Sequence, residues 1–145
     1  MSGVTGDFRA LDALISKLGK LGPEMRSECA VVFAEQLGTL VSEGFDKAEA
    51  PDGAPWTPLT PRTVARRRKR SARPLLDTGR LRSSIRITSD AEGVYLSTSV
   101  VYAATHQHGR GAIPARPFLP GDPLPSGWAA ALEETARDLL EHLLP

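Results

Sequence analysis

Apolar residues recur at helical spacing in two stretches near the start of the chain. In the first stretch Asp7 is suited to cap a helix whose apolar positions are Leu11, Leu14, Ile15, Leu18 and Leu21. Gly22-Pro23 then breaks the chain and restarts it, since proline suits the first turn of a new helix. The face of this second, longer helix comprises Met25, Cys29, Val32, Phe33, Leu37, Leu40, Val41 and Phe45. We therefore predict a helical arm over residues 1–22, followed by a single domain over residues 23–145.

The middle of the chain changes to a strand-like pattern. Leu81, Ile85 and Ile87 begin one such stretch, and Val94–Thr98 forms another. The polar residues 89–93 between them supply a turn, which predicts an antiparallel β-hairpin. Residues 100–105 are expected to extend this sheet or to return to it. Before it, Asp77-Thr78-Gly79 indicates a turn or a helix cap.

Two long loops and a final helix complete the predicted fold. Residues 49–62 are rich in proline, and Trp56 and Leu59 indicate that this loop is pinned onto the body of the protein. Residues 107–126 carry glycine and proline throughout. Ser126 then suits the start of a helix with an apolar face of Trp128, Leu132, Ala136, Leu139 and Leu143. The fold class is α+β, with N-terminal helices, a small antiparallel sheet, long Pro/Gly-rich loops and a C-terminal helix.

Composition narrows the class of protein without identifying it. The 145 residues carry a formal net charge of +1, which excludes a global field for binding polyanions. A single cysteine excludes an internal disulfide and is typical of a reducing cytoplasm. No apolar run approaches the length of a membrane span, and the first residues lack a secretory-signal pattern. We expect a soluble cytoplasmic domain with no membrane contact.

Candidate catalytic residues are few. His106 and His108 would share one face if they lay on a strand, a geometry that metals use. The third histidine, His142, is far away in sequence, and Cys29 lies in an apolar helix face. The acidic residues of the last helix are expected to form a solvated face. We expect no enzymatic activity, no cofactor and no metal, and regard polar loop contacts as the role of the two histidines.

The strongest local electrostatic feature is a basic run. It comprises Arg62, Arg66, Arg67, Arg68, Lys69, Arg70 and Arg73. Such a run can contact phosphates or acidic patches on another protein, or it can remain a solvated, mobile loop. Without interleaved aromatic residues, base stacking is not indicated, so any contact with DNA would be independent of sequence and sensitive to salt.

Four phrases in order resemble the phage virion morphogenesis family, which includes tail-completion proteins. They are Pro51-Asp52-Gly53-Ala54-Pro55-Trp56-Thr57-Pro58-Leu59, Leu75-Leu76-Asp77-Thr78-Gly79-Arg80-Leu81-Arg82-Ser83-Ser84-Ile85, Tyr102-Ala103-Ala104-Thr105-His106-Gln107-His108-Gly109 and Ile113-Pro114-Ala115-Arg116-Pro117-Phe118-Leu119. The resemblance covers roughly residues 20 to 142. The family usually has an aromatic residue where His108 stands and glycine where Pro120 stands.

The resemblance implies a structural virion protein of the neck, or head–tail junction, assembled in the host cytoplasm. Such a subunit would form a homo-oligomeric ring, sixfold or twelvefold, and contact neighbouring neck, connector and tail proteins. A ring needs a heterologous interface between two different surfaces of the subunit. Arg66, Arg67, Arg68, Lys69 and Arg70 are our candidates for an interface or for non-specific DNA contact in a channel.

The loop residues are a second set of interface candidates. They are Trp56, Tyr102, His106, His108, Arg116 and Phe118. An ordered loop that presents an arginine and an aromatic residue is typical of subunit interfaces. The alternative is intramolecular: Trp56 and Phe118 close a small core.

The sequence leaves three other functions open. A tail terminator, which is a ring that caps the tail tube, belongs to the same class of protein. A DNA-binding accessory protein without sequence preference would rest on the arginine run alone. A metal-dependent hydrolase that uses His106 and His108 is the least favoured function, and it predicts stoichiometric bound metal.

Overall fold

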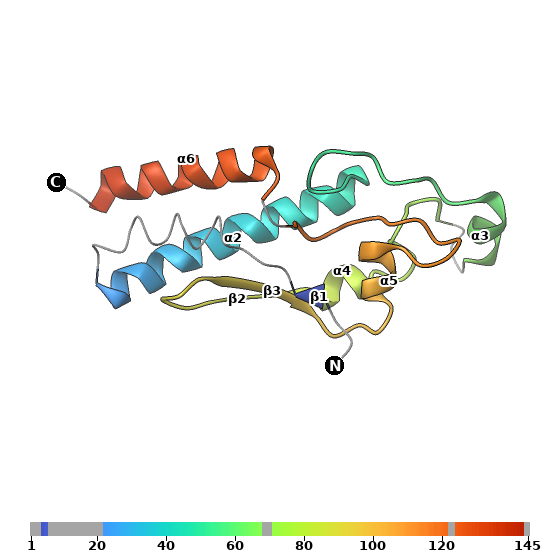
Figure 1. The fold of residues 1–145 in the computed structure, drawn as a ribbon, viewed down its shortest axis with the longest axis horizontal. Helices are drawn as coiled ribbons and strands as arrows, with labels where there is room; N and C mark the ends of the chain where they lie inside the picture. The colour runs from blue at the N-terminus through green and yellow to red at the C-terminus, as the bar shows by residue number, and fades with distance from the viewer. Residues whose placement is uncertain (1–3, 6–21, 68–70, 122–123, 144–145) are drawn as a thin grey trace.

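The computed structural model describes residues 4–5, 22–67, 71–121 and 124–143. In these ranges the chain is α+β, as predicted. The elements are β1 (Val4–Thr5), α2 (Pro23–Lys47), α3 (Pro61–Arg66), α4 (Arg80–Ser84), β2 (Arg86–Ser89), β3 (Val94–Thr98), α5 (Ala103–His108) and α6 (Ser126–Leu143). Figure 1 shows an elongated arrangement in which α2 lies between α6 and the small sheet.

Helix α2 is the central element of the fold. It begins at Pro23 after the extended residue Gly22, as the Gly-Pro pair predicts, and Glu24 in its first turn suits the helix dipole. It ends where Ala48 adopts a left-handed conformation, with φ of 54°. The side chains buried along it are Cys29, Ala30, Phe33, Leu37, Val41 and Phe45. The predicted apolar face of this helix is therefore the face that forms the core.

The sheet has three antiparallel strands in the order β1-β3-β2. The β2–β3 hairpin is the predicted one, with Arg86 opposite Ser97 and Ser89 opposite Val94. Val94, Leu96 and Thr98 are buried on β3, while Tyr95 between them is exposed. This alternation places one face of the sheet against α2. Val4 and Thr5, which fall in the predicted arm, pair with the other edge of β3. The helix expected over residues 7–21 lies outside the described residues.

Two predicted strand segments are helices instead. Leu81 begins no strand, because Gly79 turns the chain with φ of 80° directly into α4, and β2 starts only at Arg86. Residues 100–105 leave the sheet as well. The Oγ1 of Thr98 accepts a hydrogen bond from the N–H of Val100 at 3.2 Å, which turns the chain, and α5 begins at Ala103. These short helices follow from the turns at Gly79 and Thr98, and the spacing of apolar residues does not predict such turns.

Helix α6 packs along the side of α2 opposite the sheet (Figure 1). It begins at Ser126, as predicted, and buries Trp128, Leu132 and Ala136. The contact also has a polar part: the side-chain N–H of Gln36 donates to the carbonyl of Ala131 at 3.0 Å, and Thr135 donates its hydroxyl to Gln36. In the described part of the chain, no helix is long and apolar enough to cross a membrane.

Candidate interaction surface

The loop after α5 is held in place by Gln107. The side-chain amide N–H of Gln107 donates to the carbonyl of Leu119 at 2.9 Å. Its amide oxygen accepts from the backbone N–H groups of Phe118 and Leu119, at 3.0 and 3.1 Å. The backbone N–H of Arg116 also donates to the carbonyl of His106 at 2.7 Å. Residues 109–119 therefore leave α5 and return to it as an ordered loop.

Arg116 ties this loop to the proline-rich segment 49–62. Its side chain is buried, with 6% of the residue exposed. The Nε–H donates to the carbonyl of Thr57 at 2.7 Å, and a terminal N–H donates to the carbonyl of Pro58 at 3.2 Å. Burial, and then the nearby charge of Arg67, lower the pKa of Arg116 from its ordinary value. A guanidinium nevertheless stays charged in proteins, so these are charge-assisted hydrogen bonds.

Trp56 and Phe118 pack inside the protein. The indole N–H of Trp56 donates to the carbonyl of Pro117 at 2.7 Å. The ring of Phe45, from α2, lies 5.5 Å from the Trp56 ring, edge to face, and 5.9 Å from the Phe118 ring. The phrase that contains Trp56 and the phrase that contains Phe118 are about sixty positions apart in the sequence, and together they close one end of the core. An interface role for these two buried side chains and for Arg116 stays a prediction, and their described contacts are intramolecular.

Tyr102, His106 and His108 lie on or beside α5, not on a strand. Residues two positions apart on a helix point roughly 200° apart, so the shared face expected for the two imidazoles is absent. His108 is exposed. His106 packs its ring edge to face with Tyr102 at 5.7 Å, and its Nδ1 is buried without a hydrogen-bond partner. Burial lowers the pKa of His106, and the charges of Arg116 and Arg67 lower it further. Nowhere in the described ranges do three metal-binding side chains gather.

The basic run begins on a short helix. Thr60 caps α3 by accepting from the N–H of Thr63, and Arg62 and Arg66 of this helix are exposed. Arg67 turns back and donates to the carbonyls of Ser71 at 3.1 Å and Arg73 at 2.6 Å. The three remaining candidates, Arg68, Lys69 and Arg70, lie outside the described residues. Part of the run is therefore an ordered corner of the protein.

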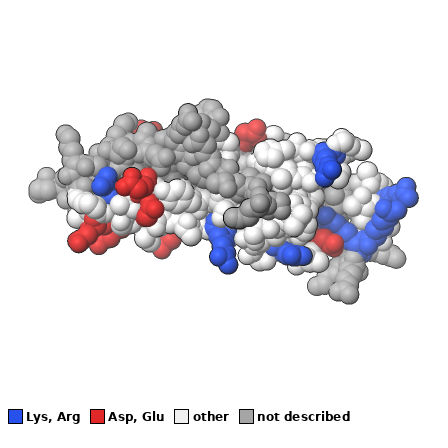
Figure 2. Space-filling view, turned by 60° about the horizontal axis from the view of Figure 1, so that its bottom comes forward, with Lys and Arg blue, Asp and Glu red and all other residues white. Residues whose placement is uncertain are grey.

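Charge is segregated along the molecule. Figure 2 shows acidic side chains gathered at the end where α2 begins and basic side chains toward the end that carries α3. The acidic end comprises the exposed residues Glu24, Glu28, Asp90, Glu92, Asp138 and Glu141, and the exposed cation Arg137 lies among them. The basic end comprises the exposed residues Arg62, Arg66, Arg80 and Arg110, and the exposed carboxylate of Asp77 lies among them. The net charge of the chain is near zero, although its two ends carry charges of opposite sign.

A groove of about 470 Å³ lies at the basic end. Leu75, Leu81 and Tyr102 give it apolar walls. Arg67, Arg80 and His106 bring positive or basic groups to the same groove, and Asp77 adds a carboxylate with no partner among the described residues. The groove is therefore an open, mainly cationic depression with an apolar part.

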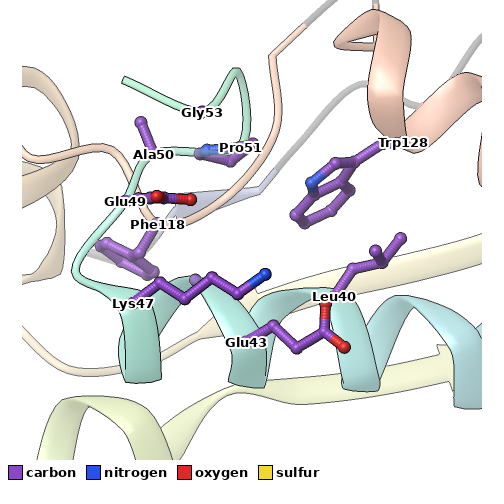
Figure 3. A pocket seen from close by; sticks show the side chains of 10 residues that line it. Leu40, Glu43, Lys47, Glu49, Ala50, Pro51, Gly53, Phe118 and Trp128 are labelled. Atoms are coloured by element: carbon purple, nitrogen blue, oxygen red, sulfur yellow. The ribbon is translucent and has the colours of Figure 1, made fainter. Parts of the chain in front are cut away.

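A smaller hollow of about 110 Å³ lies where the start of α6 meets the end of α2 and the turn at residues 50–53 (Figure 3). The indole of Trp128 lies at one side of it and the ring of Phe118 at another, while Glu43 and Lys47 extend along its edge from α2. Its apolar walls, Ala50, Phe118 and Trp128, are side chains that already pack the core. We regard it as a seam between elements and not as a ligand site.

Some residues that shape this surface were not among the sequence candidates. Gln107 stands within one of the four phrases, so the phrase itself was the available signal. Arg82 pairs with Asp46 at 2.8 Å and fastens α4 to the end of α2. The hydrogen bond from Arg82 lowers the pKa of Asp46. No local sequence pattern predicts the Arg82–Asp46 ion pair, because the two residues are far apart in the sequence.

Comparisons with known proteins support one family. The model described as the phage virion morphogenesis family matches residues 7–144, nearly the whole chain. A search of curated proteins gave no match, and neither did a search of solved structures.

Proposed function

Because the chain belongs to the phage virion morphogenesis family, we propose that it is a neck or tail-completion subunit that works in a ring joining tail to head. Membership makes the chain a phage structural protein with a role in virion morphogenesis. The ring and its place at the head–tail junction are the finer steps that we propose. Assembly in the host cytoplasm, next to connector and tail proteins, follows from that place.

The segregation of charge is the observation that carries the proposal. A ring of identical subunits needs two different surfaces that complement each other, because each copy meets the next head to tail. This chain has an acidic end and a basic end on opposite ends of an elongated body (Figures 1 and 2). Complementary potentials fix the orientation of such a contact and suppress wrong ones.

The ordered loops support a structural role. Gln107 fixes the loop at residues 109–119 to α5 through amide hydrogen bonds, and Arg116 fixes the same loop to the proline-rich segment through charge-assisted ones. Rigid loops lose little entropy on association, because their conformation is set beforehand. The basic end is thus built as a pre-formed contact surface.

The segment Arg66 to Arg70 serves such a ring in one of two ways. It contacts acidic residues of a neighbouring subunit or ring, or it lines a channel through which genomic DNA passes. The exposed Arg66 at the end of α3 favours neither partner by itself. DNA contact would weaken strongly as salt rises from about 50 to 200 mM.

A cryo-electron microscopy reconstruction of intact virions tests the proposed place. A ring of this chain at the head-proximal end of the tail is the expected result, and the map would give its symmetry. A ring that caps the tail tube and contacts no head protein would instead identify a tail terminator. Mature particles that lack the chain would overturn the proposal.

Substitution of the basic segment tests its part in assembly. We expect that replacing Arg66, Arg67, Arg68, Lys69 and Arg70 with serine blocks the formation of normal virions. A control variant replaces two exposed cations outside the segment, Arg86 and Arg137, with serine. Normal virions from the serine variant would show that the segment is dispensable.

A further inference from the structure

The groove at the basic end has a counterpart at the acidic end, the turn between β2 and β3. This turn carries two exposed carboxylates, on Asp90 and Glu92. Its shape is fixed internally: the Oδ1 of Asp90 accepts from the N–H groups of Glu92 at 2.7 Å and Gly93 at 3.0 Å. The N–H of Asp90 donates to the carbonyl of Gly93 at 3.0 Å. The result is a rigid, acidic tip.

We propose that the groove formed by Arg67, Arg80, Leu75, Leu81 and Tyr102 receives the Asp90–Gly93 turn of a second copy of this chain. This contact rests on the proposed ring and names the surfaces that build it. The turn and the groove lie at opposite ends of the same body, so the turn cannot reach its own groove (Figure 1). Repetition of the contact therefore links copies head to tail, and a closed series of such contacts is a ring.

The chemistry of the groove fits a peptide turn better than a nucleic-acid backbone. Arg67 and Arg80 complement the carboxylates of Asp90 and Glu92. The apolar walls suit the small side chain of Ala91, which stands between these two acidic residues. The carboxylate of Asp77, which has no partner among the described residues, can accept a hydrogen bond from peptide N–H groups, whereas a phosphate chain brings only further negative charge.

The contact is small, and this determines the conditions of the experiment. One turn in one groove buries less surface than a stable dimer in dilute solution needs. Self-association should therefore be measured by sedimentation velocity on the purified full chain, up to the millimolar concentrations that neighbouring sites experience within an assembly. A wild-type chain that stays monomeric at these concentrations would overturn the proposal.

A charge-reversal cycle identifies the two surfaces. Arg80→Glu and Glu92→Arg each turn an attraction into a repulsion, and we expect each to weaken self-association about tenfold. The double variant restores the pair with opposite polarity, so it should recover most of the loss. Both side chains are exposed and make no described side-chain hydrogen bond, so folding is retained.

Matched controls separate this contact from a general effect of charge. Arg86→Glu and Glu134→Arg change the net charge by the same amounts at exposed sites outside the groove and the turn. Equal losses in the controls, or a double variant no better than the singles, would refute the named contact. An Arg80→Glu variant that loses binding to duplex DNA while its self-association is unchanged would assign the groove to phosphates. A ring present in the virion map but unaffected by these variants would leave the proposed function intact and remove this contact alone.

Discussion

Gly109 ends α5 in a conformation that side chains seldom adopt, with φ of 76° and ψ of 162°. A Cβ at this position would lie 2.9 Å from the backbone nitrogen of Ala115 and 3.0 Å from the carbonyl oxygen of Ile113. Both neighbours are backbone atoms of the ordered loop, so neither can move without disturbing the contacts of Arg116. The loop therefore passes α5 at a distance that only glycine permits.

Replacing Gly109 with alanine should destabilise the fold by about 2–4 kcal/mol, because backbone strain and a steric clash add. Gly111→Ala is the matched control, since Gly111 also has positive φ but open space around it. We expect a loss of about 1 kcal/mol there. Urea denaturation of both variants measures the difference, and equal losses would show that the close approach to Ala115 is unimportant.

Arg116→Lys should cost about 2–3 kcal/mol of unfolding free energy, although the charge is kept. A lysine cannot reproduce the planar fork that reaches the carbonyls of Thr57 and Pro58, and it leaves buried acceptors unpaired. Arg110→Lys, at an exposed position in the same loop, should change stability by less than about 0.5 kcal/mol. Chemical denaturation with both variants checks this, and a tolerant Arg116 would mean that the charge alone matters.

His106 makes stability depend on pH. Its pKa in the folded state is lowered from the ordinary histidine value of 6.5, so the folded protein binds fewer protons than the unfolded chain near that pH. The contribution of His106 is therefore complete above about pH 6.5 and is lost as the pH falls below it. We expect His106→Gln to flatten the decline in unfolding free energy between pH 7.5 and 5.5. The exposed His108→Gln variant is the control, and an unchanged slope in His106→Gln would contradict the assignment.

At the scale of elements, α2 and α6 pack through apolar side chains and through hydrogen bonds that join Gln36 to Ala131 and Thr135. Thr135→Val keeps the shape of the side chain but removes the hydroxyl that donates to Gln36, so a part-buried amide oxygen loses its donor. We expect a loss of about 1 kcal/mol and faster amide hydrogen exchange confined to α6. Exchange that rises equally in β3 would instead indicate that α6 and the sheet unfold as one unit.

The spacing of apolar residues predicted the long helices and the hairpin but not the short helices. Helices α2 and α6 and the β2–β3 hairpin were predictable, because their buried positions recur at the period of a helix or a strand. Helices α4 and α5 were not, because they are only one or two turns long and follow from the turns at Gly79 and Thr98. The same turn at Thr98 leads into α5, so His106 and His108 lie on a helix and their imidazoles do not share a face as they would on a strand.

The candidate surface was predictable only in part, for a similar reason. The family phrases pointed to Trp56, Arg116 and Phe118, and the sequence left open whether Trp56 and Phe118 contact a neighbour or close the core. Their inward orientation depends on Phe45 and on the carbonyls of Thr57 and Pro58, which only the folded chain brings near them. The charge segregation also needs the fold, because acidic residues from α2, β2–β3 and α6 are far apart in sequence.

For the whole molecule, the two charged ends predict how assembly responds to salt. Contacts between exposed charges weaken as ions screen them, so head-to-tail association should fall as NaCl rises from about 50 to 500 mM. Sedimentation velocity of the wild-type chain across this range measures the response. Association that strengthens with salt would point instead to the exposed apolar residues Val101, Tyr102 and Ile113 as the contact.

Helix α2 has a mechanical consequence for such a ring. Its 25 residues span about 37 Å at roughly 1.5 Å per residue, and it begins at the acidic end and runs toward the basic end (Figure 1). If copies join end to end, tension around the circumference runs along this helix, parallel to its ladder of hydrogen bonds. The sheet on one side and α6 on the other brace it against buckling (Figure 1). Each subunit would then act as a stiff link in a hoop, strongest in the direction in which pressure from within would stretch it.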